Sequence, residues 1–269
     1  MTSTALLYDC FSGICGDMHI GAMVDLGVPV EWLSAELGKL ELAGEFTLRV
    51  AQADKMGITG TQATVDVDPS VAKPARRLTD IKQIISTADY PPEVERLAIR
   101  IFEEIGVAEA KIHGTTVEQI HFHEVGATDS IVDIVAAAIC LNYLNVETIL
   151  CGTVEVGGGM VKCAHGILPV PAPATAEILL GVPLHYGRVD SEATTPTGAA
   201  ILKSVVDEFA IPDGFVANKI GYGIGRKDFE IPNVLRVVLG EVPAAASDRI
   251  EKETNVLIEC NIDDMSPEA

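Results

Sequence analysis

Two histidines, a glutamate and two aspartates lie close together near the middle of the chain, at positions His121, His123, Glu124, Asp129 and Asp133. Imidazole and carboxylate groups are common protein ligands of divalent transition-metal ions. If residues 120–124 are extended, the two histidines point to the same face of the strand. The spacing therefore predicts a metal site. The alternative is that these side chains are hydrogen-bonded structural residues.

A helix is predicted directly after this group. Gly126 turns the chain, Thr128 is a suitable N-cap, and helical apolar sequence runs to about Leu144. Asp129 in the first turn is favoured by the helix dipole. Asp133 lies one turn further on in an apolar run, where burial of an unpaired carboxylate is costly. Asp133 is therefore either a metal ligand or the partner of a buried Arg or Lys.

A second acidic pair flanks the first glycine-rich turn. Residues 5–9 are predicted as a buried strand and residues 18–26 as a helix, so that Asp9 and Asp17 could face a metal ion together. Ser12 and Gly13 lie in the turn between them, where backbone N–H groups at a helix N-terminus could bind an anion. The turn matches neither GxGxxG nor a P-loop. The alternative is that Ser12 and Asp17 only cap it.

Two later segments are candidates for holding an anionic ligand. Residues 157–175 run from glycines to prolines and are predicted as a shaped loop over a site, with Lys162 and His165 as its cation and its titratable group. A helix is predicted to begin at Thr194 or Thr195, and its threonine-rich start, which includes Thr197, could hold a phosphate or carboxylate.

Three smaller features leave alternatives open. The basic, glycine-rich residues 221–227 are predicted either as a phosphate-binding turn or as a plain hairpin loop. His113 could add a ligand to the central group or lie in a surface loop. Of the six cysteines, Cys140 is expected in the core, and Cys10, Cys15 and Cys163 are better candidates for chemistry.

Composition narrows the class of protein. A net charge of −20 over 269 residues argues against a nucleic-acid partner, because phosphate binding needs clustered Lys and Arg. The apolar runs are too short to cross a membrane, and no signal peptide is evident, so we expect a cytoplasmic protein without a membrane partner. Cysteines spread without a CxxC pair predict no disulfide framework.

The order of elements predicts the fold class. Buried runs alternate with helical periods, which predicts an α/β fold with at least one mixed sheet covered by helices, in one unit over residues 1–245. Residues 246–269 are predicted as a linker and the start of a C-terminal domain. They contain a strand over 256–261 and then Asp263, Asp264 and Glu268 in a helix-start pattern. A hard metal ion could hold nucleotide phosphates there, or these acids could only cap the helix.

Five segments, in order along almost the whole chain, resemble the nickel insertion proteins, a family that completes the nickel-pincer nucleotide cofactor of lactate racemase. They are residues 9–18, 121–133, 165–175, 194–199 and 261–268. Cys15 stands where the family usually has a small residue, so a thiolate ligand there is not general. Family members are often longer, and the resemblance identifies this chain with their N-terminal part.

The resemblance implies a nickel chelatase of the lyase class. Such an enzyme inserts Ni²⁺ into a pyridinium mononucleotide that bears two thiocarboxylates, in a reaction that uses CTP with Mg²⁺ or Mn²⁺. Formation of a nickel–carbon bond needs a base for the ring proton, and His165 and Glu124 are the candidates. The precursor-binding candidates are Ser12, Gly13, Lys162, Thr194, Thr195 and Thr197.

Partners and alternatives follow from the same resemblance. We expect a homo-oligomer that works with the C-terminal part of the protein and with other proteins of lactate racemase maturation. The nucleotide step is expected in the C-terminal part, so this chain should bind Ni²⁺ without binding CTP tightly. A metal-dependent hydrolase shares the His-x-His arrangement, and a nickel chaperone would bind the metal without turnover.

Overall fold

The computed structural model describes residues 2–42, 44–68, 70, 76–122, 126–163 and 166–243, with only the backbone of His121. The strands are β1 (Thr2–Asp9), β2 (Phe46–Lys55), β3 (Ile58–Val67), β4 (Arg76–Arg77), β5 (His121–Phe122), β6 (Thr148–Cys151), β7 (Val154–Glu155), β8 (Met160–Cys163), β9 (Gly166–Pro169), β10 (Leu184–His185), β11 (Val216–Ile224) and β12 (Val234–Pro243). The helices are α1 (Gly16–Asp25), α2 (Val30–Leu37), α3 (Leu78–Ser86), α4 (Pro92–His113), α5 (Thr128–Leu144), α6 (Pro173–Ile178) and α7 (Pro196–Val205).

The main sheet has six strands in the order β2-β3-β11-β12-β1-β6. Two pairs, β1 with β6 and β3 with β11, are parallel, and the other pairs are antiparallel. The sheet is therefore mixed, and its helices complete the α/β fold that the sequence predicts. Three two-stranded pairs, β7 with β10, β4 with β5 and β8 with β9, lie outside it.

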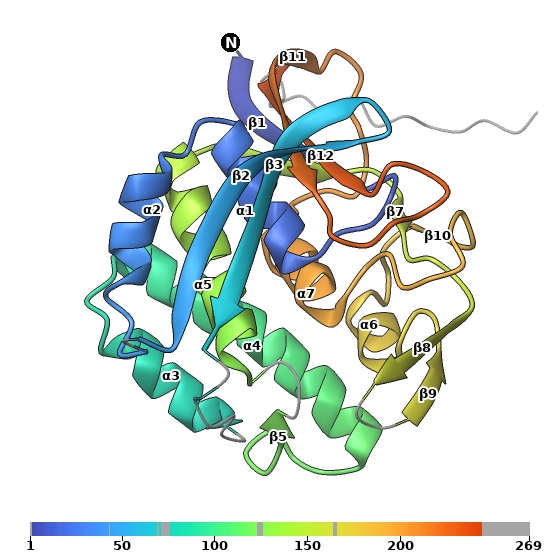
Figure 1. Cartoon of the computed structure of the whole chain (residues 1–269). Coiled ribbons are helices and arrows are strands. Elements are labelled where there is room, and N and C mark those ends of the chain that lie inside the picture. The colour runs from blue at the N-terminus through green and yellow to red at the C-terminus, as the bar shows by residue number, and fades with distance from the viewer. Residues whose placement is uncertain are drawn as a thin grey trace, which may run out of the picture.

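Alternation along β1 separates two apolar layers. Leu6 and Tyr8 belong to the large core, whereas Ala5 and Leu7 belong to a smaller cluster with Leu150. Successive side chains of a strand point to opposite faces, so β1 has apolar residues on both faces of the sheet. Figure 1 shows α1 and α5 behind strands β2 and β3 of the main sheet.

Helix α5 is the central helix of the core. Almost every residue from Ile131 to Leu141 is buried, and α1, α2, α4, α7 and β3 all contact it. A helix that is apolar all round must be enclosed by other elements. Asp133 is the acidic exception in this run, and it lies where the helix faces a cavity.

Two predictions about local structure are wrong. Thr128 is the first helical residue and Ala127 the N-cap, because the Thr128 hydroxyl donates to Glu45 Oε2 at 2.7 Å instead of capping. Residues 221–224 continue strand β11 instead of forming a turn. Their glycines serve packing, since a Cβ on Gly223 would lie 1.8 Å from the carbonyl oxygen of Met18 in α1.

The predicted start of helix α7 is confirmed, and the structure also places the β2–β3 turn and His113. The β2–β3 hairpin turns at Met56–Gly57. Thr195 is the N-cap of α7, and its Oγ1 accepts from the backbone N–H of Gly198 at 3.2 Å. His113 lies in the last turn of α4 and not in a separate loop. Within the part of the chain that the structure describes, no helix has the length and apolar character needed to cross a membrane.

Candidate functional site

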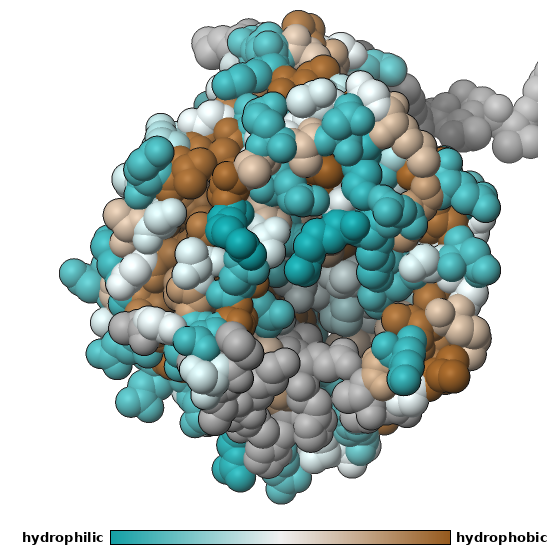
Figure 2. Space-filling view, viewed as in Figure 1, coloured by the Kyte–Doolittle hydropathy of each residue, from teal (hydrophilic) through white to brown (hydrophobic). Residues whose placement is uncertain are grey.

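A cavity of about 520 Å³ opens where several chain segments meet. Its walls come from the start of α1, the end of α4, the start of α5, the β8–β9 pair, α6, the start of α7 and Arg226 after β11. On the face shown in Figure 2 the surface is hollowed near its centre, and hydrophilic residues lie above the hollow. The cavity therefore gathers segments that are far apart in the sequence.

Three of the predicted acidic ligands line this cavity. Asp17 is in the first turn of α1, whereas Asp129 and Asp133 come from the first two turns of α5. Asp129 is exposed and accepts from the backbone N–H of Ser130 at 2.8 Å. The two helix starts thus bring the first glycine-rich turn and the start of α5 to one cavity.

The carboxyl group of Asp133 is held in an unusual environment. Its Oδ1 is buried and has no hydrogen-bond partner among the described residues. Burial raises the pKa of Asp133 well above its usual range, the charges of Asp17 and Asp129 raise it further, and Arg226 acts in the opposite direction. A protonated carboxyl with a free oxygen at a cavity wall can bind a cation only by releasing its proton.

Cys15 and Asp17 form a hydrogen-bonded pair beside Asp133. The Cys15 thiol donates to Asp17 Oδ1 at 2.7 Å, and the backbone N–H of Met18 donates to the same oxygen at 2.8 Å. Burial raises the pKa of Cys15, as do the charge of Asp17 and its hydrogen bond. The thiol is therefore protonated at neutral pH in the ligand-free protein.

The cavity also has two strongly basic side chains. Lys162 projects from β8, is exposed, and has no hydrogen-bond or ion-pair partner among the residues that the structure describes. Arg226 Nε donates to Asp17 Oδ2 at 3.0 Å. Thr195 and Thr197 at the start of α7 complete this part of the lining. Lys162, Thr195 and Thr197 are thus brought together as the sequence analysis expects.

Other predicted site residues lie elsewhere in the fold. Asp9, at the end of β1, forms an ion pair with Arg236, whose Nε donates to Asp9 Oδ2 at 2.8 Å. Ser12 and Thr194 are fully buried, and neither lines the cavity. Gly13 has φ 83° and packs against Ala193, where a Cβ would lie 2.2 Å from the carbonyl oxygen. These four residues support the walls and do not face the cavity.

The cysteines divide in the same way. Cys15 and Cys163 line the cavity, whereas Cys10 is fully buried in the core and therefore does not fit the chemical role considered for it. A hydrogen bond with Cys151 and burial raise the pKa of Cys10, which keeps that thiol protonated. Cys140 is a core residue, as predicted.

Four predicted functional groups lie outside the described residues, namely the side chain of His121 and the residues His123, Glu124 and His165. Within the described ranges, no three His, Cys, Asp or Glu side chains converge closely enough to hold a metal ion alone. Phe122 and Gly126, which flank residues 123–125, are in contact, since a Cβ on Gly126 would lie 2.8 Å from the Phe122 carbonyl oxygen.

A buried arginine fixes the start of α5. Arg76 in β4 donates to the carbonyl oxygen of Gly126 at 3.1 Å, to Thr128 Oγ1 at 3.2 Å and to Glu45 Oε2 at 3.0 Å. The side chain of Arg76 is only 8% exposed. A buried charge is tolerated when it is paired and hydrogen-bonded, so this network ties the helix that carries Asp129 and Asp133 to β4.

Similarity to known proteins shows the family to which the chain belongs. The family model described as "Nickel insertion protein" matches residues 6–269. The chain belongs to the nickel insertion protein family.

Relatives in this family are similar over nearly all of the chain. The "Pyridinium-3,5-bisthiocarboxylic acid mononucleotide nickel insertion protein" of Clostridium kluyveri is 50% identical, over 98% of this chain and 67% of the relative. The protein of the same name from Clostridium acetobutylicum is 46% identical, over 98% and 69%. A "Putative nickel insertion protein" of Wolinella succinogenes is 49% identical, over 98% and 65%.

The chain spans about two thirds of the length of these nickel insertion proteins. No solved structure matches it. The cavity described above therefore belongs to the segment that this chain shares with the longer relatives.

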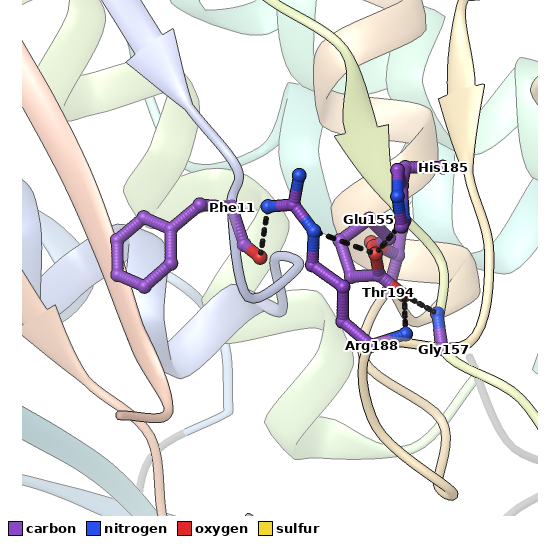
Figure 3. Close-up of polar contacts among 6 residues, drawn as sticks. All are labelled: Phe11, Glu155, Gly157, His185, Arg188 and Thr194. Atoms are coloured by element: carbon purple, nitrogen blue, oxygen red, sulfur yellow. Dashed lines mark hydrogen bonds and ion pairs between the residues drawn. The ribbon is translucent and has the colours of Figure 1, made fainter. Parts of the chain in front are cut away.

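Glu155 is a buried glutamate that was not among the residues predicted from the sequence. The side chain of Glu155 is fully buried and accepts from the backbone N–H groups of Gly157, at 2.9 Å, and Arg188, at 3.3 Å. It also contacts His185 Nδ1 at 2.6 Å and Arg188 Nε at 3.7 Å. Figure 3 shows these groups converging on Glu155.

The same cluster links two segments that lead into the cavity. Arg188 donates to the carbonyl oxygen of Phe11 in the first turn at 3.3 Å, and Thr194 Oγ1 donates to that of Glu155 at 2.6 Å. Phe11 precedes Cys15 and Asp17, and Thr194 precedes Thr195. The network therefore sets the positions of both segments. A lone Glu in a short strand gives no sequence signal of this role, which arises from long-range contacts.

Proposed function

We propose that this chain binds Ni²⁺ and a pyridinium-3,5-bisthiocarboxylic acid mononucleotide in the cavity, so that nickel is inserted into the nucleotide. Relatives of 50% and 46% identity carry names that state this activity. The observation that carries the proposal for this chain is one cavity whose lining includes three aspartates, a cysteine thiol, Lys162 and Arg226. The aspartates can attract a metal ion and a cationic ring, and the two basic side chains can attract anionic substituents.

We propose Asp129 and Asp133 as carboxylate ligands that receive Ni²⁺. Imidazole nitrogens and carboxylate oxygens bind Ni²⁺ and can release it to softer sulfur donors such as thiocarboxylates. His121, His123 and Glu124 are proposed to complete the ligand set, because Arg76 holds Gly126 and Thr128 between these residues and Asp129. Asp17 is proposed to act beside them, since it lines the same cavity. Asp9 is proposed as a structural partner of Arg236 and not as a ligand.

The precursor is proposed to bind through cations and hydroxyl groups of the cavity lining. Lys162 is an unpaired ammonium among the described residues, and Thr195 and Thr197 contribute polar groups at the start of α7. Ser12, Gly13 and Thr194 are proposed to support this lining from behind. A cavity of about 520 Å³ falls in the usual range for small-molecule sites.

Insertion of nickel at a ring carbon replaces a C–H bond with a nickel–carbon bond and releases one proton, without a change of oxidation state. A base near the metal must take that proton. His165 and Glu124 are proposed for this role from the family resemblance. Asp133 is a further candidate in its ionised form, because its Oδ1 has no hydrogen-bond partner among the described residues.

The remaining parts of the proposal rest on the family resemblance. They are classification as a lyase of lactate racemase maturation, use of CTP with Mg²⁺ or Mn²⁺, assembly as a homo-oligomer, and a place in the cytoplasm. We propose that CTP is used by residues after 245, where Asp263 and Asp264 lie, and that residues 1–245 form the nickel- and precursor-binding domain.

Nickel binding by this chain tests the proposal. Titration calorimetry should show saturable Ni²⁺ binding that falls at least tenfold in affinity in Asp129→Asn and Asp133→Asn. Glu147→Gln is a matched control, because Glu147 is exposed and far along the chain after α5. Unchanged nickel affinity in both aspartate variants would overturn the assignment of the cavity.

Turnover separates insertion from simple storage. This chain should be incubated with the precursor mononucleotide and Ni²⁺, with and without CTP and Mg²⁺. Mass spectrometry then shows whether nickel has been inserted into the nucleotide. If CTP is used after residue 245, the chain binds nickel and precursor but shows no tight CTP binding in calorimetry. Tight CTP binding that Lys162→Ala abolishes would place the nucleotide step in the cavity and contradict this division.

A further inference from the structure

A second recess of about 430 Å³ adjoins the cavity. The two share the residues Cys15, Asp17, Glu192, Thr195 and Arg226. The recess is then lined by Met18, Ala193, Lys227, Phe229 and Asn233, and its lining includes none of Asp129, Asp133 and Lys162. It therefore extends the cavity past Arg226, away from the acidic start of α5 and from Lys162.

Arg226 stands at the junction with most of its donors unused. Its Nε binds Asp17, and the two terminal nitrogens of its guanidinium have no partner among the described residues. The Arg226 side chain is 64% exposed. Asp17 also accepts from the Cys15 thiol and the Met18 N–H, so its charge is met by three donors. Arg226 can therefore bind an anion without releasing Asp17.

Lys227 adds a second cation to the recess. Its Nζ lies 3.2 Å from the carbonyl oxygen of Glu192 and 3.7 Å from Glu192 Oε2, and half of its side chain is exposed. The backbone beneath it is fixed, because the Lys227 carbonyl oxygen accepts from Asn233 Nδ2 at 2.9 Å and from Lys55 Nζ at 3.2 Å. The turn after β11 thus holds two adjacent cationic side chains in place.

We infer that this recess binds the phosphate group of the pyridinium mononucleotide, with Arg226 and Lys227 as its anchors. The inference rests on the proposed function and adds the orientation of the ligand. Asp17 and Glu192 line both spaces, each beside a cation of the recess, whereas Glu109, Asp129 and Asp133 line only the main cavity. A phosphate dianion is repelled by the acids that line only the main cavity, whereas nickel and the pyridinium ring are attracted to them.

The chemistry of the two anionic ends separates them. A guanidinium with free terminal nitrogens matches the geometry of phosphate oxygens through paired hydrogen bonds. Lys162 lines the main cavity but not the recess, and it is left for a thiocarboxylate. The ligand therefore lies across the cavity with its phosphate beside Arg226 and its ring beside Asp129 and Asp133.

Binding of two related probes tests this orientation. Nicotinic acid mononucleotide and nicotinic acid riboside share a pyridinium ring, a ring carboxylate and a ribose, and differ only in the phosphate. Calorimetry at one fixed ionic strength is needed because salt screens exposed charges. The wild-type chain should bind the mononucleotide at least tenfold more tightly than the riboside. The double variant Arg226→Ala, Lys227→Ala should lose that preference and keep the riboside affinity.

Two further variants complete the design. Lys203→Ala removes an exposed cation that donates to the Leu180 carbonyl oxygen outside the recess, and it should keep the full preference. Arg226→Lys keeps the positive charge at this position and should retain part of the preference for the mononucleotide. The phosphate site would be overturned, and the proposed function left standing, if the double variant kept the full preference for the mononucleotide. Loss of that preference in Lys162→Ala instead would have the same meaning. Failure of the wild-type chain to bind either probe would overturn the proposed function as well.

Discussion

Gly16 at the start of α1 lies directly against the carboxyl group of Asp133 in α5. A Cβ on Gly16 would be 2.3 Å from Asp133 Oδ2, a distance that real side chains do not reach. The absence of a side chain at position 16 is therefore what allows the Asp133 carboxyl to face the cavity from α5. This contact joins the first glycine-rich turn to the central acidic group.

The first prediction follows from that contact. Gly16→Ala should displace the Asp133 carboxyl, lower nickel affinity at least tenfold and destabilise the fold by about 1–3 kcal/mol through overpacking. Calorimetry and urea unfolding measure the two effects. Gly152→Ala is the matched control, because a Cβ there meets only Ile211 at 3.7 Å. Equal nickel affinity in the two variants would show that the contact has no role in metal binding.

The second prediction concerns pH. The pKa of Asp133 is raised in the folded state above its ordinary value of 3.8, so the folded protein keeps this proton to higher pH than the unfolded chain. The stabilisation from this group is complete below the ordinary value and is lost as pH rises through the raised one. Asp133→Asn should therefore remove a decline in the free energy of unfolding above about pH 4.

Comparison of variant with wild type isolates this effect from other groups. Burial lowers the pKa of His19 from 6.5 to about 3, so His19 acts in the opposite direction and destabilises the fold as pH falls between those values. The contribution of His19 to the pH profile should be the same in the wild type and in Asp133→Asn. Urea unfolding at several pH values measures it, and parallel profiles throughout would show that Asp133 is ionised in the folded protein.

The third prediction concerns Glu155. Glu155→Gln keeps the shape of the side chain but places an amide group where four donors converge, and it should cost about 1–3 kcal/mol of stability. Because the network reaches Phe11 and Thr194, precursor affinity should fall as well. Thermal unfolding and calorimetry measure both effects. Retention of wild-type stability would show that His185 and Arg188 do not depend on this carboxylate.

The fourth prediction concerns the buried charge of Arg76. Arg76→Ala leaves Glu45 without its ion-pair partner and removes the donors that hold Gly126 and Thr128, so it should cost about 3–5 kcal/mol. Arg96→Ala breaks an exposed ion pair with Glu93 and should change the free energy of unfolding by less than about 1 kcal/mol. Similar effects of the two substitutions in urea unfolding would contradict the role of Arg76 at the start of α5.

The sequence predicted the elements whose signals are local. The apolar run after Thr128 predicted the central helix, and Thr195 before Pro196 predicted the start of α7, because capping and periodicity depend on near neighbours. Asp17, Asp129, Asp133, Lys162, Thr195 and Thr197 were candidates from residue type, and all six line one cavity. Five of them lie at the starts of α1, α5 and α7, and Lys162 lies in β8.

Features set by long-range contacts were not predictable in the same way. The glycines of residues 221–224 read as a turn, but Gly223 instead lets α1 pack closely on β11. Asp9 looked like a metal ligand, yet its partner Arg236 is 227 residues away in sequence. The anchoring roles of Arg76 and Glu155 likewise depend on which distant segments meet, and a single sequence does not show that.

Diffraction at the nickel absorption edge tests the central claim most directly. Crystals of this chain soaked with Ni²⁺ should give an anomalous difference peak in the cavity, bonded to Asp129 or Asp133, and Asp133→Asn should weaken it. A peak confined to a half-exposed imidazole such as His185, with none in the cavity, would contradict the account.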